Sequence, residues 1–291
     1  MAGGGDTALA VRQRAEQLAA RLPPLLVAAH RIAATVAAGV HGRRRAGRGD
    51  GFWQFRRYQS GDAAALIDWR QSARTQPLYV RETEREAAQS VWLWADRSGS
   101  MDYRSAAALP GAKREHAELL LLALGVLLVR AGERVALLGG GQRPGAGAPA
   151  LEGLALALPE RTAGLPEPEA LPRHARLVLV GDLLSPLAET GQLIGRFSAR
   201  GVRGHLLQVL DPAEETLPFS GRVAFSGFEG EETLLVPRVE TVRAAYHARL
   251  AGHRAGLAAL ARDAGWSFAV HRTDRPPQAA LLALVTVLGQ P

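Results

Sequence analysis

Residues 91–101 read VWLWADRSGSM, and the prediction of the fold begins with them. Five apolar residues in a row, with no charge among them, are typical of a strand that is buried on both faces of a sheet. The run ends at Asp96, and Gly99 with a serine on either side indicates a tight loop. An apolar strand that ends in a carboxylate and a polar loop is what open α/β sheets present at the edge where they bind ligands.

The rest of the chain continues this alternation of strands and helices. Further strands are predicted at 134–138, 175–181, 205–210 and 266–271, and helices at about 113–130, 151–158, 187–199, 239–264 and 277–288. This order predicts an α/β fold with a mostly parallel sheet and helices on both faces. Residues 211–237 interrupt the alternation and are predicted to form a β-hairpin insertion.

A second predicted strand also ends in a carboxylate, Asp182. Because parallel strands share one carboxyl edge, we expect Asp182 to lie at the same edge as Asp96, Ser98 and Ser100, whose alternate spacing lets three side chains converge. Two carboxylates and two hydroxyls would suit a hard divalent cation such as Mg²⁺, which takes few protein oxygens. The same residues also suit a strand-end turn that satisfies backbone N–H groups. The spacing alone leaves both interpretations open.

Composition excludes several classes of protein. The chain has no cysteine, which excludes disulfides, thiolate zinc sites and cysteine nucleophiles. No apolar run reaches about 18 residues, and the start of the chain lacks the pattern of a signal peptide, so we expect a cytoplasmic protein without a transmembrane segment. The net charge of +7 comes from 34 arginines and a single lysine, Lys113. Such a preference for arginine over lysine is typical of a bias in the composition of the coding DNA. The positive charge therefore does not by itself predict a specific nucleic-acid partner.

Residues 1–86 are predicted to form a helical and basic/aromatic extension of the α/β domain at 87–291. They hold 14 arginines against 8 acidic residues, so an electrostatic partner such as an acidic membrane surface would meet this part of the chain. For the basic run at 43–48 a solvated loop is favoured over a binding site for phosphate or an acidic membrane, because a single cluster of four arginines is weak evidence. Asp62 and residues 67–70, IDWR, are interpreted as a buried salt-bridge cluster with Trp69 in the core.

Several motifs, in order along the chain, resemble the bacterial family called Domain of Unknown Function 58. They are residues 47–62 (GRGDGFWQFRRYQSGD), 67–74 (IDWRQSAR), 78–82 (LYVRE), 96–101 (DRSGSM) and 211–221 (DPAEETLPFSG). The loop D-x-S-x-S by itself resembles the metal-ion-dependent adhesion site of von Willebrand factor A-type domains. The family resemblance implies a von Willebrand A-like, Rossmann-type fold.

The resemblance also implies a function. Members of the family are suspected to be metal-dependent adaptors in the assembly or activation of other proteins, and their genes often lie beside those of MoxR-type AAA+ ATPases. In adhesion-type domains a loop threonine completes the metal site, and the candidate in this sequence is Thr162. We therefore expect a non-enzymatic adaptor whose open coordination position takes a partner's carboxylate. The expected ligands of Mg²⁺ or Mn²⁺ are Asp96, Ser98, Ser100, Asp182 and Thr162.

Two other classes of function stay open. A metal-free or membrane-peripheral scaffold would use the basic N-terminal segment instead of a metal. A metal-dependent hydrolase would use the same ion to activate water, although the sequence shows no general base close to the site. Neither a G-x-S-x-G nucleophile motif nor a complete phosphate-binding loop occurs in the sequence.

Overall fold

The computed structural model describes residues 29–37, 52–59, 67–74, 77–83, 89–158, 164–228, 230 and 232–289. The chain divides into two compact units, one made of residues 1–39 and 89–291 and the other of residues 40–88. The predicted boundary at 86 lies close to residue 89, where the larger unit resumes. The described N-terminal helix, 29–37, belongs to this larger unit rather than to the extension.

The larger unit is built on a five-stranded sheet with the order β4-β3-β5-β6-β9. All neighbouring strands in it are parallel. The strands are β3 (Ser90–Ala95), β4 (Arg134–Leu137), β5 (Arg176–Gly181), β6 (Arg203–Leu210) and β9 (Ser267–Arg272). The chain passes from β3 to β4 on one side and then returns to β5 on the other. The strand order therefore switches between β3 and β5, which is where open α/β sheets form their binding crevice.

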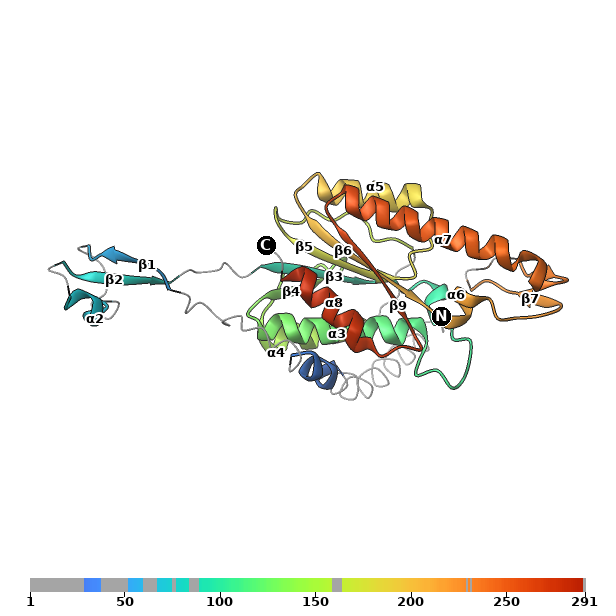
Figure 1. Ribbon diagram of the computed structural model, residues 1–291, viewed down its shortest axis with the longest axis horizontal. Helices are drawn as coiled ribbons and strands as arrows, with labels where there is room; N and C mark the ends of the chain where they lie inside the picture. Colours follow the sequence, from blue (N-terminus) through green and yellow to red (C-terminus); the bar gives the residue numbers. More distant parts are fainter. Residues whose placement is uncertain are drawn as a thin grey trace, which may run out of the picture. The chain divides into compact units, whose positions relative to one another are not determined.

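Helices cover both faces of the sheet (Figure 1). On one face lie α3 (Lys113–Arg130), α4 (Gly147–Ala157) and α8 (Pro277–Leu288), and on the other lie α5 (Leu187–Ser198) and α7 (Val239–Asp263). The predicted α/β fold is thereby confirmed. Helix α4 begins four residues earlier than the predicted 151, because Pro149 falls in the first turn, where its missing N–H breaks no helical hydrogen bond.

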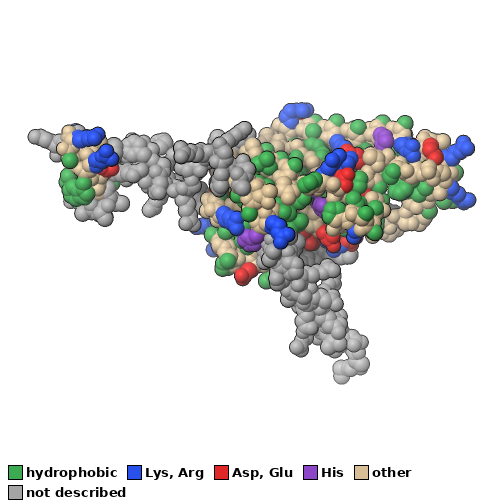
Figure 2. Space-filling model, turned by 60° about the horizontal axis from the view of Figure 1, so that its bottom comes forward, with side chains coloured by type: hydrophobic (Ala, Val, Ile, Leu, Met, Phe, Trp, Pro, Cys, Tyr) green, Lys and Arg blue, Asp and Glu red, His purple; other side chains and the backbone are tan. Residues whose placement is uncertain are grey.

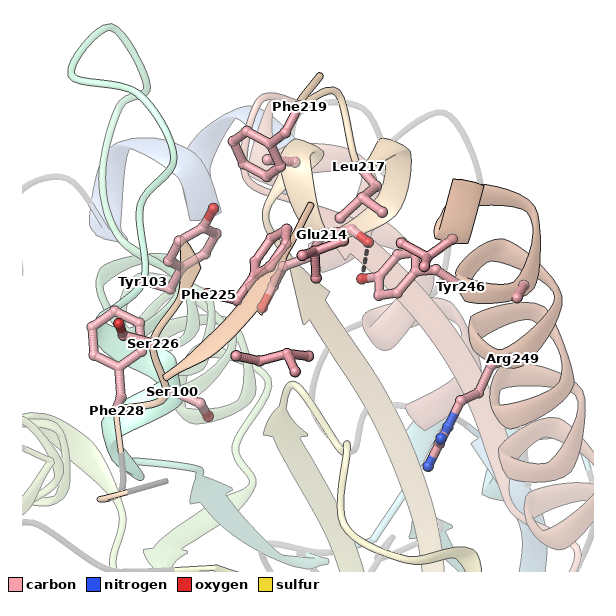
Figure 3. A pocket seen from close by; sticks show the side chains of 15 residues that line it. Ser100, Tyr103, Glu214, Leu217, Phe219, Phe225, Ser226, Phe228, Tyr246 and Arg249 are labelled. Carbon is pink, nitrogen blue, oxygen red and sulfur yellow. Dashed lines mark hydrogen bonds between the residues drawn. The ribbon is translucent and has the colours of Figure 1, made fainter. Parts of the chain in front are cut away.

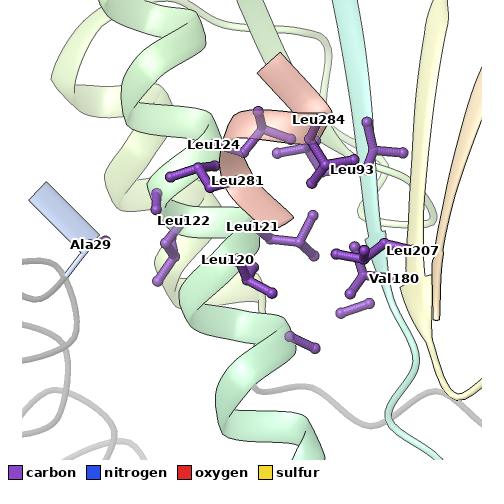
Figure 4. Packing of buried hydrophobic residues seen from close by; sticks show 14 of the residues in the cluster. Ala29, Leu93, Leu120, Leu121, Leu122, Leu124, Val180, Leu207, Leu281 and Leu284 are labelled. Atoms are coloured by element: carbon purple, nitrogen blue, oxygen red, sulfur yellow. The ribbon is translucent and has the colours of Figure 1, made fainter. Parts of the chain in front are cut away.

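Side chains alternate between two cores, one on each face of the sheet. In β3, Leu93 faces the core beneath α3 and α8, whereas Trp92 and Trp94 face the core beneath α5 and α7. The same period of two divides β5, where Val180 lies in the first core and Leu179 in the second. Figure 4 shows the first core, where leucines of α3 and α8 gather beside Leu93, Val180 and Leu207 of the strands. This packing explains why the strand sequences are apolar on both faces.

Helix α3 is apolar on nearly all sides because it is enclosed by other elements. It packs against the sheet, α4 and α8, and residues Ala29, Ile32 and Val36 of the N-terminal helix lie in the same core. Its run of leucines is thus accounted for by burial within the unit. None of the described helices has the length and apolar character needed to cross a bilayer.

Shorter elements stand at the carboxyl edge of the sheet. They are the 3₁₀ helix η2 (Gly99–Asp102), helix α6 (Pro212–Thr216) and strands β7 (Val223–Phe225) and β8 (Leu234–Val236). Strands β7 and β8 pair antiparallel, with Ala224 opposite Leu235. The predicted β-hairpin insertion is thereby confirmed.

The smaller unit contains two strands that the sequence did not predict. Strands β1 (Phe52–Arg57) and β2 (Tyr79–Thr83) pair antiparallel, and the short helix α2 (Trp69–Ser72) precedes β2. Asp68 caps α2 by accepting a hydrogen bond from the Gln71 backbone N–H at 2.9 Å. The prediction that Trp69 lies in a core was wrong, since its side chain is 64% exposed. Asp68 acts there as a helix cap, and Asp62 lies outside the described residues.

The described surface carries mixed charge. On the face shown in Figure 2, arginine side chains of the larger unit stand at separate places, some of them next to acidic side chains. The described residues of that face thus form no broad basic patch of the kind that nucleic-acid binding requires. The basic run at 43–48 lies outside the described residues.

His205 of β6 should make the protein less stable in mild acid. Burial, with Arg176 nearby, lowers the pKa of His205 to about 4. Its Nδ1 lies 2.8 Å from Ser267 Oγ, and its buried Nε2 has no partner among the described residues. As the pH falls, His205 therefore binds a proton in the unfolded chain before it does so in the folded chain. The stability that neutral His205 contributes above pH ~6.5 is lost as the pH falls towards about 4.

Urea unfolding at about pH 7.5 and pH 5 should show that His205 contributes roughly 2 kcal/mol to this loss. The His205→Asn variant retains a polar partner for Ser267 but cannot be protonated, so its stability should depend less on pH by that amount. An identical pH dependence in the two proteins would contradict the expectation.

Candidate functional site

The candidate site lies at the carboxyl edge of the sheet, at the switch between β3 and β5. Asp96 directly follows β3, and its backbone N–H donates to Val180 O at 2.8 Å, which holds it against the end of β5. Asp182 directly follows β5. Between them Gly181 is required, because a Cβ atom at this position would lie 2.5 Å from Asp96 Cβ. The two predicted carboxylates therefore come from adjacent strand ends.

The loop after β3 brings its two serines to the same place. The Ser98 backbone N–H donates to Asp96 Oδ1 at 2.9 Å, which closes the turn. Ser100 Oγ donates to Asp182 Oδ2 at 2.6 Å and lies 3.0 Å from Ser98 Oγ. Because Ser100 has only one hydroxyl proton, Ser98 must be the donor between the two hydroxyls. Four of the five predicted metal ligands thus form one chain of polar contacts.

The loop after β5 is held in a strained conformation. Leu183 has a φ of 51°, in the left-handed region that a leucine rarely adopts. Its side chain is buried in the core, and its carbonyl oxygen lies 2.7 Å from His253 Nε2 of α7. Gln208 Nε2 donates to the carbonyl oxygen of Asp182 at 2.8 Å. Packing and these bonds overcome the local strain and aim Asp182 at the loop after β3.

Lys113 is a member of this cluster that the sequence analysis missed. It is the first residue of α3, its side chain is fully buried, and its ammonium donates to Asp182 Oδ2 at 3.0 Å and to Glu214 Oε1 at 2.6 Å. A signal was present in the composition, since this is the one lysine of a chain with 34 arginines. A compact ammonium fits between two carboxylates where a planar guanidinium needs more room.

Asp211 and Glu214 anchor α6 against the loop after η2. Asp211 caps α6 by accepting from the Ala213 N–H at 2.8 Å, and its other oxygen accepts from the Ser105 N–H at 2.9 Å. Glu214 Oε2 accepts from the Asp211 N–H at 2.8 Å while Oε1 accepts from Lys113. Asp211 thus caps a helix and ties two loops together.

Burial and mutual repulsion govern the charges of the cluster. Burial, followed by the neighbouring Asp182 carboxylate, raises the pKa of Asp96 to about 6. Burial also raises the pKa of Glu214, against the opposing effect of Lys113. For Lys113 burial acts to lower the pKa, but the carboxylates of Asp182 and Glu214 outweigh it and the pKa is raised. Lys113 is therefore a permanent positive charge among three carboxylates.

Three of the four described oxygen donors are spaced as the ligands of a small divalent cation would be. Mg²⁺ bonds oxygens at about 2.1 Å in octahedral geometry, so neighbouring ligand oxygens lie roughly 3 Å apart. Ser98 Oγ and Ser100 Oγ are 3.0 Å apart, and Ser100 Oγ and Asp182 Oδ2 are 2.6 Å apart. Among the described residues no three carboxylate or imidazole side chains gather into a metal-binding group, so a cation here would depend on the serine hydroxyls. Thr162, the fifth predicted ligand, lies outside the described residues.

The parallel sheet defines the class of protein: an α/β protein whose polar groups gather at the carboxyl edge of the sheet, at the switch in strand order. The chain belongs to the family described as protein of unknown function DUF58, whose model matches residues 54–160 and 161–256. The predicted family membership is thereby confirmed.

Individual relatives are more distant. Uncharacterized proteins of Mycobacterium tuberculosis (Rv1480) and Mycobacterium bovis (Mb1516) are each 27% identical over 240 residues, which cover 76% of this chain and 74% of theirs. Among solved structures, the conserved hypothetical protein BatB of Bacteroides thetaiotaomicron is 12% identical, with a TM-score of 0.36 over 69% of this chain and 98% of that one. An aerotolerance-related membrane protein of Bacteroides fragilis is 14% identical, with a TM-score of 0.38 over 68% of this chain and 98% of that one.

Proposed function

We propose that the chain is a non-enzymatic adaptor that binds a partner protein through a divalent metal ion, Mg²⁺ or Mn²⁺, at the switch between β3 and β5. The observation that carries the proposal is the convergence of Asp96, Ser98, Ser100 and Asp182 from two loops onto one point. These four residues would hold the ion. Thr162 remains the candidate for a further ligand from the loop between α4 and β5.

The charge of the cluster supports this proposal. Asp96, Asp182 and Glu214 surround the single ammonium of Lys113, which leaves a formal charge of −2 when all three carboxylates are ionised. When bound, a dication would balance this charge, and its open coordination position would accept a carboxylate oxygen of the partner. Asp182 and Glu214 are both paired with Lys113, so part of the negative charge at the site is already neutralised and a bound ion would keep positive charge for an incoming carboxylate.

The described residues around the site also favour binding over catalysis. Lys113 contacts Asp182 and has Glu214 behind it, and both are committed to an internal ion pair, while Gln208 donates to the Asp182 carbonyl oxygen. Such a pair stabilises the edge of the sheet but presents no free base to a substrate. A MoxR-type AAA+ ATPase, which the family resemblance suggests, is the partner to test first, and the encounter would take place in the cytoplasm or at the membrane surface.

Calorimetric titration with Mg²⁺ and Mn²⁺ tests the proposed site directly. The wild-type chain should bind one ion saturably, and Asp96→Asn should abolish the binding, because the variant removes one of the two carboxylate ligands but conserves side-chain shape. Asp263→Asn is the matched control, since Asp263 is an exposed carboxylate at the end of α7, at the opposite edge of the sheet. A correctly folded wild-type chain without saturable binding would contradict the proposal.

Binding of the partner protein is tested with the same wild-type chain and the same two variants. Retention of a MoxR-type ATPase on the immobilised chain should require Mg²⁺, disappear with EDTA and be lost in Asp96→Asn but not in Asp263→Asn. Retention that is indifferent to EDTA would point to the metal-free scaffold instead.

A further inference from the structure

A pocket of about 570 Å³ opens beside the candidate metal site, between α6, the β7–β8 hairpin and the first half of α7 (Figure 3). Its size is typical of a site that takes one ligand group. Two ring pairs shape its walls, Phe219 against Phe225 at 5.8 Å and Tyr103 against Phe228 at 6.0 Å between ring centroids. Its apolar lining includes Leu217, Phe219, Phe225, Phe228, Leu234 and Val242.

The floor of the pocket is held firmly by α7. Tyr246 donates a hydrogen bond to the carbonyl oxygen of Glu214, and Arg243 Nε donates to that of Leu217 at 3.0 Å. Arg243 also donates to Phe219 O at 2.6 Å. Three carbonyl groups of the segment at 214–219 are thus fixed to one helix. The pocket is therefore preformed rather than created by a ligand.

Large apolar side chains around the pocket are left exposed to solvent. Phe228 is 54% exposed, Leu234 64% and Val242 39%, and Leu235 of the same hairpin is 47% exposed. Single exposed apolar residues are ordinary, but three of these, Phe228, Leu234 and Val242, line the same pocket. Such a group of exposed apolar side chains beside a polar site is typical of a surface that binds another protein.

Charge at the two sides of the pocket defines what would bind. Figure 3 places Ser100, a proposed metal ligand, on one side and Arg249 of α7 on the other. Among the described residues Arg249 has no hydrogen bond or ion pair, whereas Glu214 is paired with Lys113. The pocket is thus apolar in the middle and carries a positive charge at Arg249 on one side, whereas the Ser100 side would favour negative charge once the proposed dication is bound beside it. A simple fatty acid would satisfy only one of these sides.

We propose that this pocket binds a short segment of the partner protein in which a large apolar side chain is flanked on both sides by acidic residues. The inference rests on the proposed metal-dependent function for one of its two charged ends. The apolar side chain enters the pocket, one acidic residue reaches the edge formed by Ser98 and Ser100, and the other pairs with Arg249. Aromatic anchors in a pocket with charged pairs around them are the usual source of affinity in such contacts.

Three capped peptides serve as probes: acetyl-Glu-Phe-Glu-amide, and the same peptide with one or two glycines on each side of the phenylalanine. In extended form their acidic residues are about 7, 14 and 20 Å apart, so the set covers the spans that a pocket of this size offers. Saturation-transfer NMR on the phenylalanine ring protons, with the full chain in Mg²⁺, measures weak binding. We expect at least one peptide to bind saturably.

Variants at exposed positions identify the site without endangering the fold. Phe228→Ser with Leu234→Ser should weaken the binding about tenfold or more, because the pocket loses two of its apolar walls. Leu156→Ser is the matched control, as Leu156 is 59% exposed on α4 and lies outside the pocket lining. Arg249→Gln should weaken binding of the peptide with two glutamates, and should have no effect on a peptide in which the glutamate facing Arg249 is glutamine.

The outcomes separate this inference from the proposed function. Failure of all three peptides to bind a chain that does bind Mg²⁺ overturns the pocket inference and leaves the metal site standing. Binding that Phe228→Ser with Leu234→Ser does not weaken also overturns it. Binding that needs the pocket residues but is unchanged by EDTA and by Asp96→Asn supports the pocket as the peptide site and overturns the metal-dependent function.

Discussion

Replacing Lys113 by methionine should lower the free energy of unfolding by about 3–5 kcal/mol. The lysine ammonium is fully buried and donates to Asp182 at 3.0 Å and to Glu214 at 2.6 Å. Methionine fills similar space but carries no charge, so Asp182 and Glu214 would keep only their neutral hydrogen-bond donors and would lose the positive charge that balances them. Removing one member of a buried ion pair costs more than the pair contributed, because the remaining charges have already lost their water.

Urea unfolding in EDTA at neutral pH measures this loss. The control is Lys113→Met combined with Asp182→Asn and Glu214→Gln, which removes the ions on both sides and should recover most of the stability. Adding Mg²⁺ should stabilise Lys113→Met more than it stabilises the wild type, because the dication would then supply the missing positive charge. A loss below about 1 kcal/mol in the single variant would show that the ion pair is not needed for folding.

Gly204→Ala should destabilise the protein by about 3 kcal/mol or more, at the upper end of overpacking effects. A Cβ atom at Gly204 would lie 2.1 Å from Trp266 Cε3 and 2.2 Å from Cδ2, so the methyl group would overlap the indole ring. The ring cannot simply move away, since it is packed in the core and its Nε1 donates to Val202 O at 3.1 Å. Relief would require a shift of β6 or of the ring.

Gly195→Ala provides the matched control for this prediction. Gly195 lies in α5 with no atom within 4 Å of its potential Cβ, so alanine there should stabilise the protein by up to about 1 kcal/mol through helix propensity. Thermal or urea unfolding of both variants measures the difference. If Gly204→Ala unfolded within about 0.5 kcal/mol of the wild type, the close contact between β6 and Trp266 would be refuted.

Part of the candidate site could be read from the sequence because its residues follow strand ends. The apolar runs before Asp96 and Asp182 predicted two buried strands, and parallel pairing then places both carboxylates at one edge. The serines follow Asp96 by two and four residues, so their positions are set locally. The β-hairpin was likewise predicted from two short runs around a turn, and the structure pairs them antiparallel.

Other members of the site could not be predicted, because no local pattern marks them. Lys113 begins a helix 17 residues after Asp96, and Glu214 lies in a short helix more than 100 residues further on. They meet only because α3 and α6 approach the same sheet edge. Trp69 shows the opposite error, since an aromatic residue beside aspartate suggested a core, whereas the structure leaves it exposed at the start of a short helix.

The sequence by itself determined the α/β fold, the hairpin and the placing of four oxygen donors at one sheet edge. These features show in its periodicity, strand-end carboxylates and turn residues, because they depend on contacts between near neighbours or on the pairing of adjacent strands. The tertiary structure alone decided that a buried ammonium joins Asp182 to Glu214 and that an apolar pocket opens beside Ser100. These features depend on how α3, α6, α7 and the hairpin pack against one another. Such packing is set by the burial of surfaces that are far apart in the sequence.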